Sequence, residues 1–243
     1  MGRGARALYP WWLRLWRDSR MNSPVRKILM LCPLLGLLHA CPALGTATGL
    51  NNIPTADVVP KDVLVLQYYG NFANRSGPDH FLGFKYGPLK NVEIGLDGRV
   101  FPTEDDRDEF AAAQGKVRFE LGEKLAVAGG IANLADHSKA GREFPYAVLS
   151  YDLGFSRAHF GGTVQKDNEG FFGGIDKTIK LFERDFTLRS DLIQVNDADD
   201  TVASVGFLYD IARNLLVESW MSFPSASEQE DVLTLKLDFV IRF

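Results

Sequence analysis

The chain has 243 residues, with 27 basic and 31 acidic side chains, a net charge of −4 and 46% hydrophobic residues. Seven basic residues and one acidic residue precede residue 46, which leaves 20 basic and 30 acidic side chains and argues against non-specific nucleic-acid binding. Both cysteines, Cys32 and Cys41, also lie in this N-terminal part. The remaining roughly 200 residues are therefore predicted to form one domain without disulfides or thiolate chemistry.

The N-terminal part divides at a second methionine, Met21. Residues 1–20 are basic and rich in tryptophan and match no later pattern, so we interpret them as a mis-called extension. After Met21 come a positively charged region, a short apolar run and a cleavage region of small residues, which is the order of a secretory signal peptide. Residues 21–45 are therefore predicted to be a signal peptide cleaved near Gly45, and lipoprotein-like cleavage at Cys41 is the alternative.

Residues 46–61 contain two prolines, Pro54 and Pro60, and are predicted to be an extended N-terminal segment that crosses a surface or a rim. From residue 62 to residue 243, short alternating runs parted by Gly, Asn, Asp and Pro indicate an antiparallel β protein. The last run is the clearest, because every odd position from Leu233 to Phe243 is large and apolar. About twelve strands are predicted, at residues 62–70, 80–87, 91–97, 115–121, 124–132, 144–153, 157–165, 170–177, 185–194, 201–210, 214–223 and 231–243.

The connections between these strands alternate in length. Short links lie near residues 87–90, 122–123, 154–156 and 211–213, and longer polar links lie at 71–79, 98–114, 133–143 and 224–230. The link at 178–184 breaks this rule, because it should be short and is not. Short turns at one end and long loops at the other are typical of outer-membrane barrels. Residues 62–243 are therefore predicted to form an all-β, up-and-down, antiparallel transmembrane barrel of about twelve strands.

The end of the chain carries a family resemblance. Leu237, Phe239, Ile241 and Phe243 resemble the C-terminal signature that bacterial outer-membrane barrels present to their assembly machinery. The resemblance implies a Gram-negative outer membrane, with lipid, lipopolysaccharide and the barrel-assembly machinery as partners. The segment from Gly49 to Ala56 also resembles the start of YjbH-like barrels that are associated with exopolysaccharide export.

If the apolar faces meet lipid, the charged positions of the strands line the lumen. The predicted lumen-lining residues are Glu93, Asp97, Lys116, Arg118, Glu120, Asp152, Arg157, His159, Arg189, Asp191, Asp210, Glu218, Lys236, Asp238 and Arg242. Acids and bases are mixed in this set, so they could neutralise one another in a network or line a water-filled pore.

Catalytic and metal sites find no support in the residue pattern. His159 has no serine two residues on, so the local His-x-Ser motif of lipid-degrading barrels is missing. The acid-rich runs at 104–109 and 196–200 lack the spacing and the glycine of a calcium loop. We therefore predict a protein that is not an enzyme and has no metal site and no cofactor.

Three functions remain open on these grounds. The favoured one is a narrow channel for small polar or cationic solutes. The second is a non-conducting structural barrel, or one that serves an export system of the envelope. The third is a soluble periplasmic β-barrel that binds an apolar ligand inside, which would turn the apolar face of Leu233 to Phe243 inward.

Overall fold

The structure is a computed structural model, and it describes residues 48–73, 78–100, 110–135, 143–165, 168–194, 201–226 and 229–243. All of these belong to one compact unit, Gly36–Phe243. The predicted extension 1–20, the predicted signal peptide 21–45 and the acid-rich runs at 104–109 and 196–200 lie outside the described residues. Among the residues that are described, no helix is both long and apolar enough to cross a membrane.

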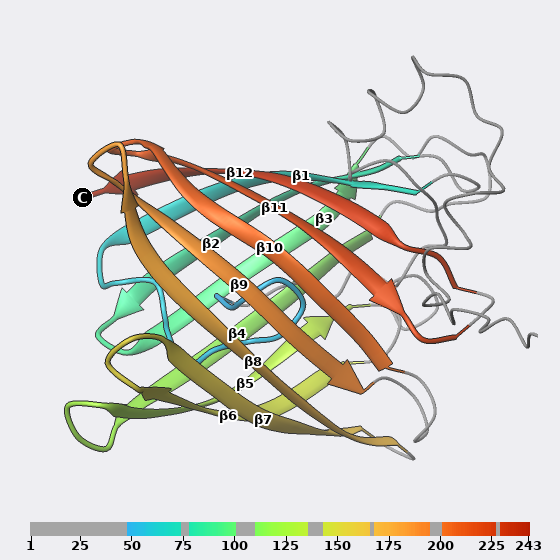
Figure 1. Cartoon of the computed structure of the whole chain (residues 1–243), viewed down its shortest axis with the longest axis horizontal. Coiled ribbons are helices and arrows are strands. Elements are labelled where there is room, and N and C mark those ends of the chain that lie inside the picture. Colours follow the sequence, from blue (N-terminus) through green and yellow to red (C-terminus); the bar gives the residue numbers. More distant parts are fainter. Residues whose placement is uncertain are drawn as a thin grey trace, which may run out of the picture. The chain divides into compact units, whose positions relative to one another are not determined.

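Twelve antiparallel strands follow one another around a closed barrel (Figure 1). They are β1 (Val63–Phe72), β2 (Asp79–Leu89), β3 (Val92–Val100), β4 (Phe110–Glu120), β5 (Leu125–Leu134), β6 (Phe144–Asp152), β7 (Arg157–Gln165), β8 (Asn168–Leu181), β9 (Arg184–Gln194), β10 (Thr201–Ala212), β11 (Leu215–Pro224) and β12 (Val232–Arg242). The barrel closes because β1 pairs with β12, from Val63 opposite Arg242 to Phe72 opposite Leu233. The predicted fold class and number of strands are confirmed.

The link between β8 and β9 differs from the prediction. Residues 178–184 suggest a long connection, whereas β8 continues to Leu181 and β9 begins at Arg184. Only Phe182 and Glu183 form the turn, with positive φ angles of 50° and 65°. Two consecutive residues of positive φ make a tight hairpin turn whose twist suits the flanking strands, a role that usually falls to Asn and Gly. Since neither residue is Asn or Gly, the sequence carries no visible turn signal here.

The tight links after β2, β4, β6, β8 and β10 all lie at the end of the barrel where the chain terminates, on the left of Figure 1. We call this the short-turn end. The backbone N–H of Phe243 donates to the Asp62 carbonyl at 3.0 Å, so the chain enters and leaves the barrel side by side. The predicted short connections at this end are confirmed, whereas at the other end only residues 166–167 separate β7 from β8, so the alternation of lengths is incomplete.

The apolar side chains of the strands face outward. In β12, Leu235, Leu237 and Phe239 are about half exposed, whereas Lys236 and Asp238 are buried. The same alternation runs round the barrel, so the outer wall carries an apolar band and the inner wall carries the charges. The third functional reading, a soluble barrel with an apolar interior, is therefore wrong.

The N-terminal segment also departs from the prediction, because it folds into the lumen instead of crossing a surface or a rim (blue in Figure 1). We call Thr48–Lys61 the plug. Its tip is a tight turn in which the Leu50 N–H donates to the Ile53 carbonyl at 3.0 Å. Ile53 and Ala56 are 2% and 0% exposed, so the apolar positions of the plug are buried inside the barrel. A short segment can be buried this way only if its backbone polar groups find partners there.

Candidate functional site

The apolar residues of the plug form one core with the inner wall. Leu50, Ile53 and Ala56 cluster with small and aromatic side chains of β5, β6, β8, β9 and β10. The wall residues of this cluster are Ala126, Ala128, Ala132, Phe144, Tyr146, Val148, Phe172, Ile193 and Val202. The three alanines on β5 leave room for the plug, and its burial removes apolar surface from water. One side of the lumen is thus a packed core and not a water channel.

A buried ion pair on β3 and β4 holds both ends of the plug. The Glu93 carboxylate accepts the backbone N–H groups of Thr48 at 3.0 Å and of Val59 at 2.8 Å. Lys116 lies 3.9 Å from Glu93, and its ammonium group donates to the carbonyl oxygens of Thr48 at 2.6 Å and Thr55 at 3.2 Å. Glu93 and Lys116 thus neutralise each other and satisfy backbone groups that the plug leaves unpaired.

A second carboxylate, on β9, holds the tip of the plug. Asp191 accepts the backbone N–H groups of Asn51 at 2.8 Å and Asn52 at 3.1 Å, and the Ser204 hydroxyl at 2.6 Å. The Asn52 side chain meets the indole N–H of Trp220, which donates to its carbonyl oxygen at 3.3 Å. Adjacent N–H groups aimed at one carboxylate oxygen make a strong, charge-assisted contact.

A third contact lies at the exit of the plug. Arg157 donates to Asp57 at 2.8 Å, and it also donates two hydrogen bonds to Asp176, of 2.6 and 3.1 Å. Arg118 approaches the same Asp57 carboxylate at 4.0 Å. The one acidic residue inside the plug is therefore held between two wall arginines.

Ser150, His159 and Asp176 lie in a row on β6, β7 and β8, although the sequence has no His-x-Ser motif. Ser150 Oγ lies 2.7 Å from His159 Nδ1, and His159 Nε2 lies 3.4 Å from Asp176. These are the residue types of a hydrolytic triad. However, Ser150 Oγ also accepts the backbone N–H of Ala56 at 2.9 Å, so the plug covers the hydroxyl. The row is another contact that holds the plug.

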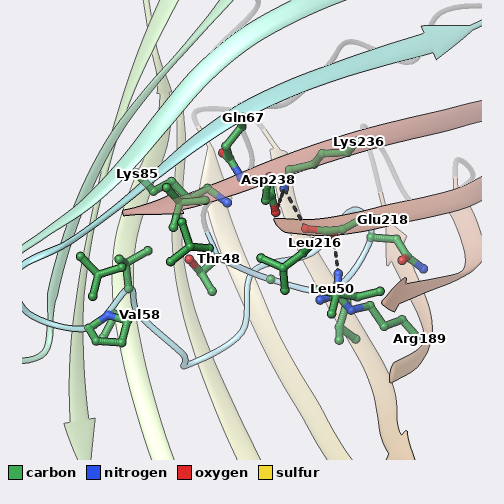
Figure 2. Close-up of a pocket in the computed structure, with 18 of the residues that line it drawn as sticks. Thr48, Leu50, Val58, Gln67, Lys85, Arg189, Leu216, Glu218, Lys236 and Asp238 are labelled. Atoms are coloured by element: carbon green, nitrogen blue, oxygen red, sulfur yellow. Dashed lines mark hydrogen bonds and ion pairs between the residues drawn. The ribbon is translucent and has the colours of Figure 1, made fainter. Parts of the chain in front are cut away.

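The opposite side of the lumen carries a charged cluster (Figure 2). Glu218 on β11 bonds Lys236 at 3.1 Å and pairs with Arg189 from β9. Lys236 also lies 3.5 Å from Asp238, which accepts the Gln67 amide at 2.9 Å. Each carboxylate of this cluster is therefore neutralised by a cation or met by a hydrogen-bond donor.

A cavity of about 310 Å³ separates this cluster from the plug. Its lining includes Leu50 and Val59 from the plug and the charged residues Lys85, Arg189, Glu218, Lys236, Asp238 and Arg242 from the wall. Val63 begins β1 and Arg242 ends β12, so the cavity extends to the short-turn end. The lumen thus contains a packed core between the plug and the wall on one side and a cavity on the other.

The predicted lumen residues are distributed over these features. Buried are Glu93, Asp97, Lys116, His159, Asp191, Glu218, Lys236 and Asp238. Partly exposed are Arg118, Arg157, Arg189 and Asp210, and exposed are Glu120, Asp152 and Arg242. Asp152 accepts the Gly154 N–H at 2.7 Å and so belongs to a turn at the short-turn end. Among the described residues, no group of His, Cys, Asp and Glu side chains could hold a metal ion.

Sequence reasoning missed several residues of the site, among them Lys85, Asp176, Ser150 and Asp57. Lys85 and Asp176 lie on the inward face of β2 and β8, where glycines at neighbouring inward positions weaken the alternation. Ser150 is polar but uncharged, and Asp57 belongs to the plug. A strict period of two through β2 and β8 would have found the first two; the plug contacts carry no sequence signal.

The four residues of the predicted assembly signature lie on the outer face or at the end of β12. Leu237 and Phe239 are 45% and 44% exposed, and Phe243, just after the strand, is 80% exposed. Ile241 is partly exposed and pairs with Leu64 of β1. They thus lie on or beside the outward face of the barrel, and their recognition by assembly machinery stays a prediction.

Comparison with known proteins identifies the fold class. No protein-family model matches the sequence, and no curated protein matches it. Among solved structures, "KdgM porin in complex with disordered oligogalacturonate" superposes with a TM-score of 0.59 at 10% identity, covering 72% of this chain and 98% of that one. KdgM porin on its own gives 0.58 at 9% identity, and NanC porin gives 0.52 at 11%, each with the same coverage. The chain therefore has the fold of outer-membrane porins, and its apolar outer band fits a barrel of the bacterial outer membrane.

Proposed function

We propose that this protein is an outer-membrane channel for small polar solutes, narrowed by its own N-terminal plug. The observation that carries the proposal is the cavity of about 310 Å³ between the plug and the charged cluster, which reaches the short-turn end. Water and small polar molecules are favoured there, because charged and amide side chains line the cavity. Movement of the plug would widen this path along the lumen.

The lining of the cavity does not favour cations over other polar solutes. It contains the cations Lys85, Arg189, Lys236 and Arg242 and the anions Glu218 and Asp238. An excess of basic side chains in a narrow, low-dielectric space repels cations. We therefore retain the polar solutes of the sequence-based hypothesis and not its preference for cationic ones.

The competing proposal is a non-conducting barrel that serves envelope structure or an export system. The packed core between Leu50, Ile53 and Ala56 and the wall favours it, because a well-packed plug closes that side of the lumen. Neither proposal includes catalysis, because the plug covers Ser150, whose hydroxyl oxygen accepts the Ala56 N–H at 2.9 Å. In both proposals, lipid, lipopolysaccharide and the barrel-assembly machinery are the expected partners.

Loosening the plug without touching the wall tests the channel proposal. A Cβ at Gly49 would lie 2.1 Å from the Ile53 carbonyl oxygen, so Gly49→Val is incompatible with the turn at the tip of the plug. The matched control is Gly129→Val on β5, where the nearest atom would be 3.9 Å away. Both proteins should still migrate faster on a detergent gel before boiling than after it, as closed barrels do.

Conductance in planar bilayers then separates the two proposals. We expect small unitary currents from the wild type and the control, and currents several times larger from Gly49→Val. If the folded Gly49→Val protein leaves the bilayer as resistive as it is without protein, the barrel is not a channel and the structural proposal gains support.

A further inference from the structure

The cavity contains one cation without a close partner. Lys85 on β2 is 4% exposed and lines the cavity. Within the described part of the chain, its ammonium group makes no hydrogen bond and no ion pair shorter than 4 Å. Figure 2 shows its side chain reaching from β2 toward Asp238 and Lys236. A buried ammonium group without a partner is costly, so a site of this kind favours a ligand that brings the missing negative charge.

Two of the three carboxylates near Lys85 are fully engaged elsewhere, and the third lies outside the cavity. Glu93 binds the plug and Lys116, and Asp238 accepts from Gln67 and lies 3.5 Å from Lys236. Asp97 accepts the Gln114 amide at 3.1 Å through one oxygen, and among the described residues its other oxygen has no hydrogen-bond partner, but Asp97 does not line the cavity. These acids influence Lys85 only from a longer range, and none of them provides the direct contact that its ammonium group lacks.

Arg242 adds a second positive charge at the mouth of the same cavity. It is exposed at the short-turn end, where its guanidinium group reaches the Arg213 carbonyl at 3.5 Å. In the described residues it pairs with no carboxylate. The positive charge of Arg242 at the opening and that of Lys85 deeper in the cavity both attract anions and raise their local concentration.

Apolar side chains form another part of the lining, beside the charged residues Arg189, Glu218, Lys236 and Asp238. Val58 and Pro60 from the plug, and Val65, Leu208 and Leu216 from the wall, face the same space. Ligand pockets usually begin at about 300 Å³ and combine apolar walls with few polar groups that fix orientation. A cavity of about 310 Å³ therefore suits a small molecule with a short apolar body, and is small for a sugar chain.

We infer that the cavity is a binding site for a small organic acid, whose carboxylate pairs with Lys85 and whose short hydrocarbon part packs against Val58, Leu208 and Leu216. A small organic acid would bind in the same cavity on which the proposed function rests. This binding does not require that the barrel conducts, because it is measured on the closed protein.

The test is calorimetric titration of the full-length protein, purified in a non-ionic detergent, with sodium hexanoate. Neutral hexanol and sodium chloride are titrated in parallel, so that the acid is compared with its apolar body and with an inorganic anion. The variants are Lys85→Gln, Lys85→Arg and the control Lys124→Gln, which removes an exposed lysine from a turn. Heat-modifiability shows that each variant is folded.

We expect hexanoate to bind the wild type, Lys85→Arg and Lys124→Gln, and to bind Lys85→Gln roughly ten-fold more weakly or worse, as loss of a charged contact implies. Hexanol and chloride should bind much more weakly than hexanoate. Equal hexanoate affinity in wild type and Lys85→Gln would overturn the inference, and so would binding of chloride as tight as that of hexanoate. Hexanoate binding by a barrel that never conducts would refute the channel proposal alone.

Discussion

The backbone N–H of Asn51 donates to the Asp191 carboxylate at 2.8 Å, although 140 positions separate the two residues in the chain. This contact places the N-terminal segment deep inside a barrel whose wall is made by the rest of the sequence. The same carboxylate accepts the N–H of Asn52 at 3.1 Å, so one side chain of β9 holds the tip of the plug.

Removal of this carboxylate should free the tip. In Asp191→Ala, the N–H groups of Asn51 and Asn52 lose a charged acceptor, and such bonds contribute about 1.5–3 kcal/mol each. We expect amide hydrogen exchange in peptides covering the plug to become at least roughly ten-fold faster, with exchange in β12 unchanged. The control is Asp185→Ala on the same strand, where the carboxylate pairs with Lys180 at the surface. Equal exchange in the two variants would show that Asp191 does not hold the plug.

The Glu93–Lys116 pair should behave as a coupled unit. Lys116→Met leaves the Glu93 carboxylate buried without its cation, which costs about 3–5 kcal/mol of unfolding free energy. The double variant Glu93→Gln/Lys116→Met should lose clearly less than the sum of the two single losses. Urea unfolding in lipid vesicles measures this, followed through Trp220, the only tryptophan after residue 45. Additive losses would mean that the two side chains act independently.

The outward face of β12 should tolerate apolar residues but not charge. Leu237 is 45% exposed on that face, so Leu237→Arg would place a guanidinium group against lipid. Near the bilayer midplane this costs roughly 2–4 kcal/mol. We expect a lower fraction of Leu237→Arg to reach the heat-modifiable form in vesicles than of the control Leu237→Ala. If both insert equally well, β12 does not face lipid at this position.

The wall of the barrel could be predicted from the sequence because strand alternation is a local property. Leu235, Leu237 and Phe239 on one face and Lys236 and Asp238 on the other define β12 without knowledge of any partner strand. The predicted lumen charges followed from the same period of two. The β8–β9 turn escaped because Phe182 and Glu183 are unusual residues for positive φ.

The plug could not be predicted, because its fold depends on contacts far away in the chain. Thr48–Lys61 has neither strand alternation nor helical periodicity, and its turn is stabilised by carboxylates of β3 and β9. Its prolines are compatible with an extended rim segment as well as with a buried turn. The pairing of Glu93 with Lys116 is likewise a property of neighbouring strands, at register positions opposite each other.

The most direct test of the central claim, that the plug narrows a conducting lumen, is to lock it by a reversible bond. Ala56 and Ser150 lie side by side, since the Ala56 N–H donates to Ser150 Oγ at 2.9 Å, so Ala56→Cys/Ser150→Cys offers a disulfide in a protein whose Cys32 and Cys41 are replaced by serine. Single-channel current is recorded from one bilayer before and after addition of a reductant, with each single-cysteine variant as control. We expect low current in the oxidised protein, a rise on reduction and no response in the controls. Equal current before and after reduction of a disulfide shown to have formed would contradict it.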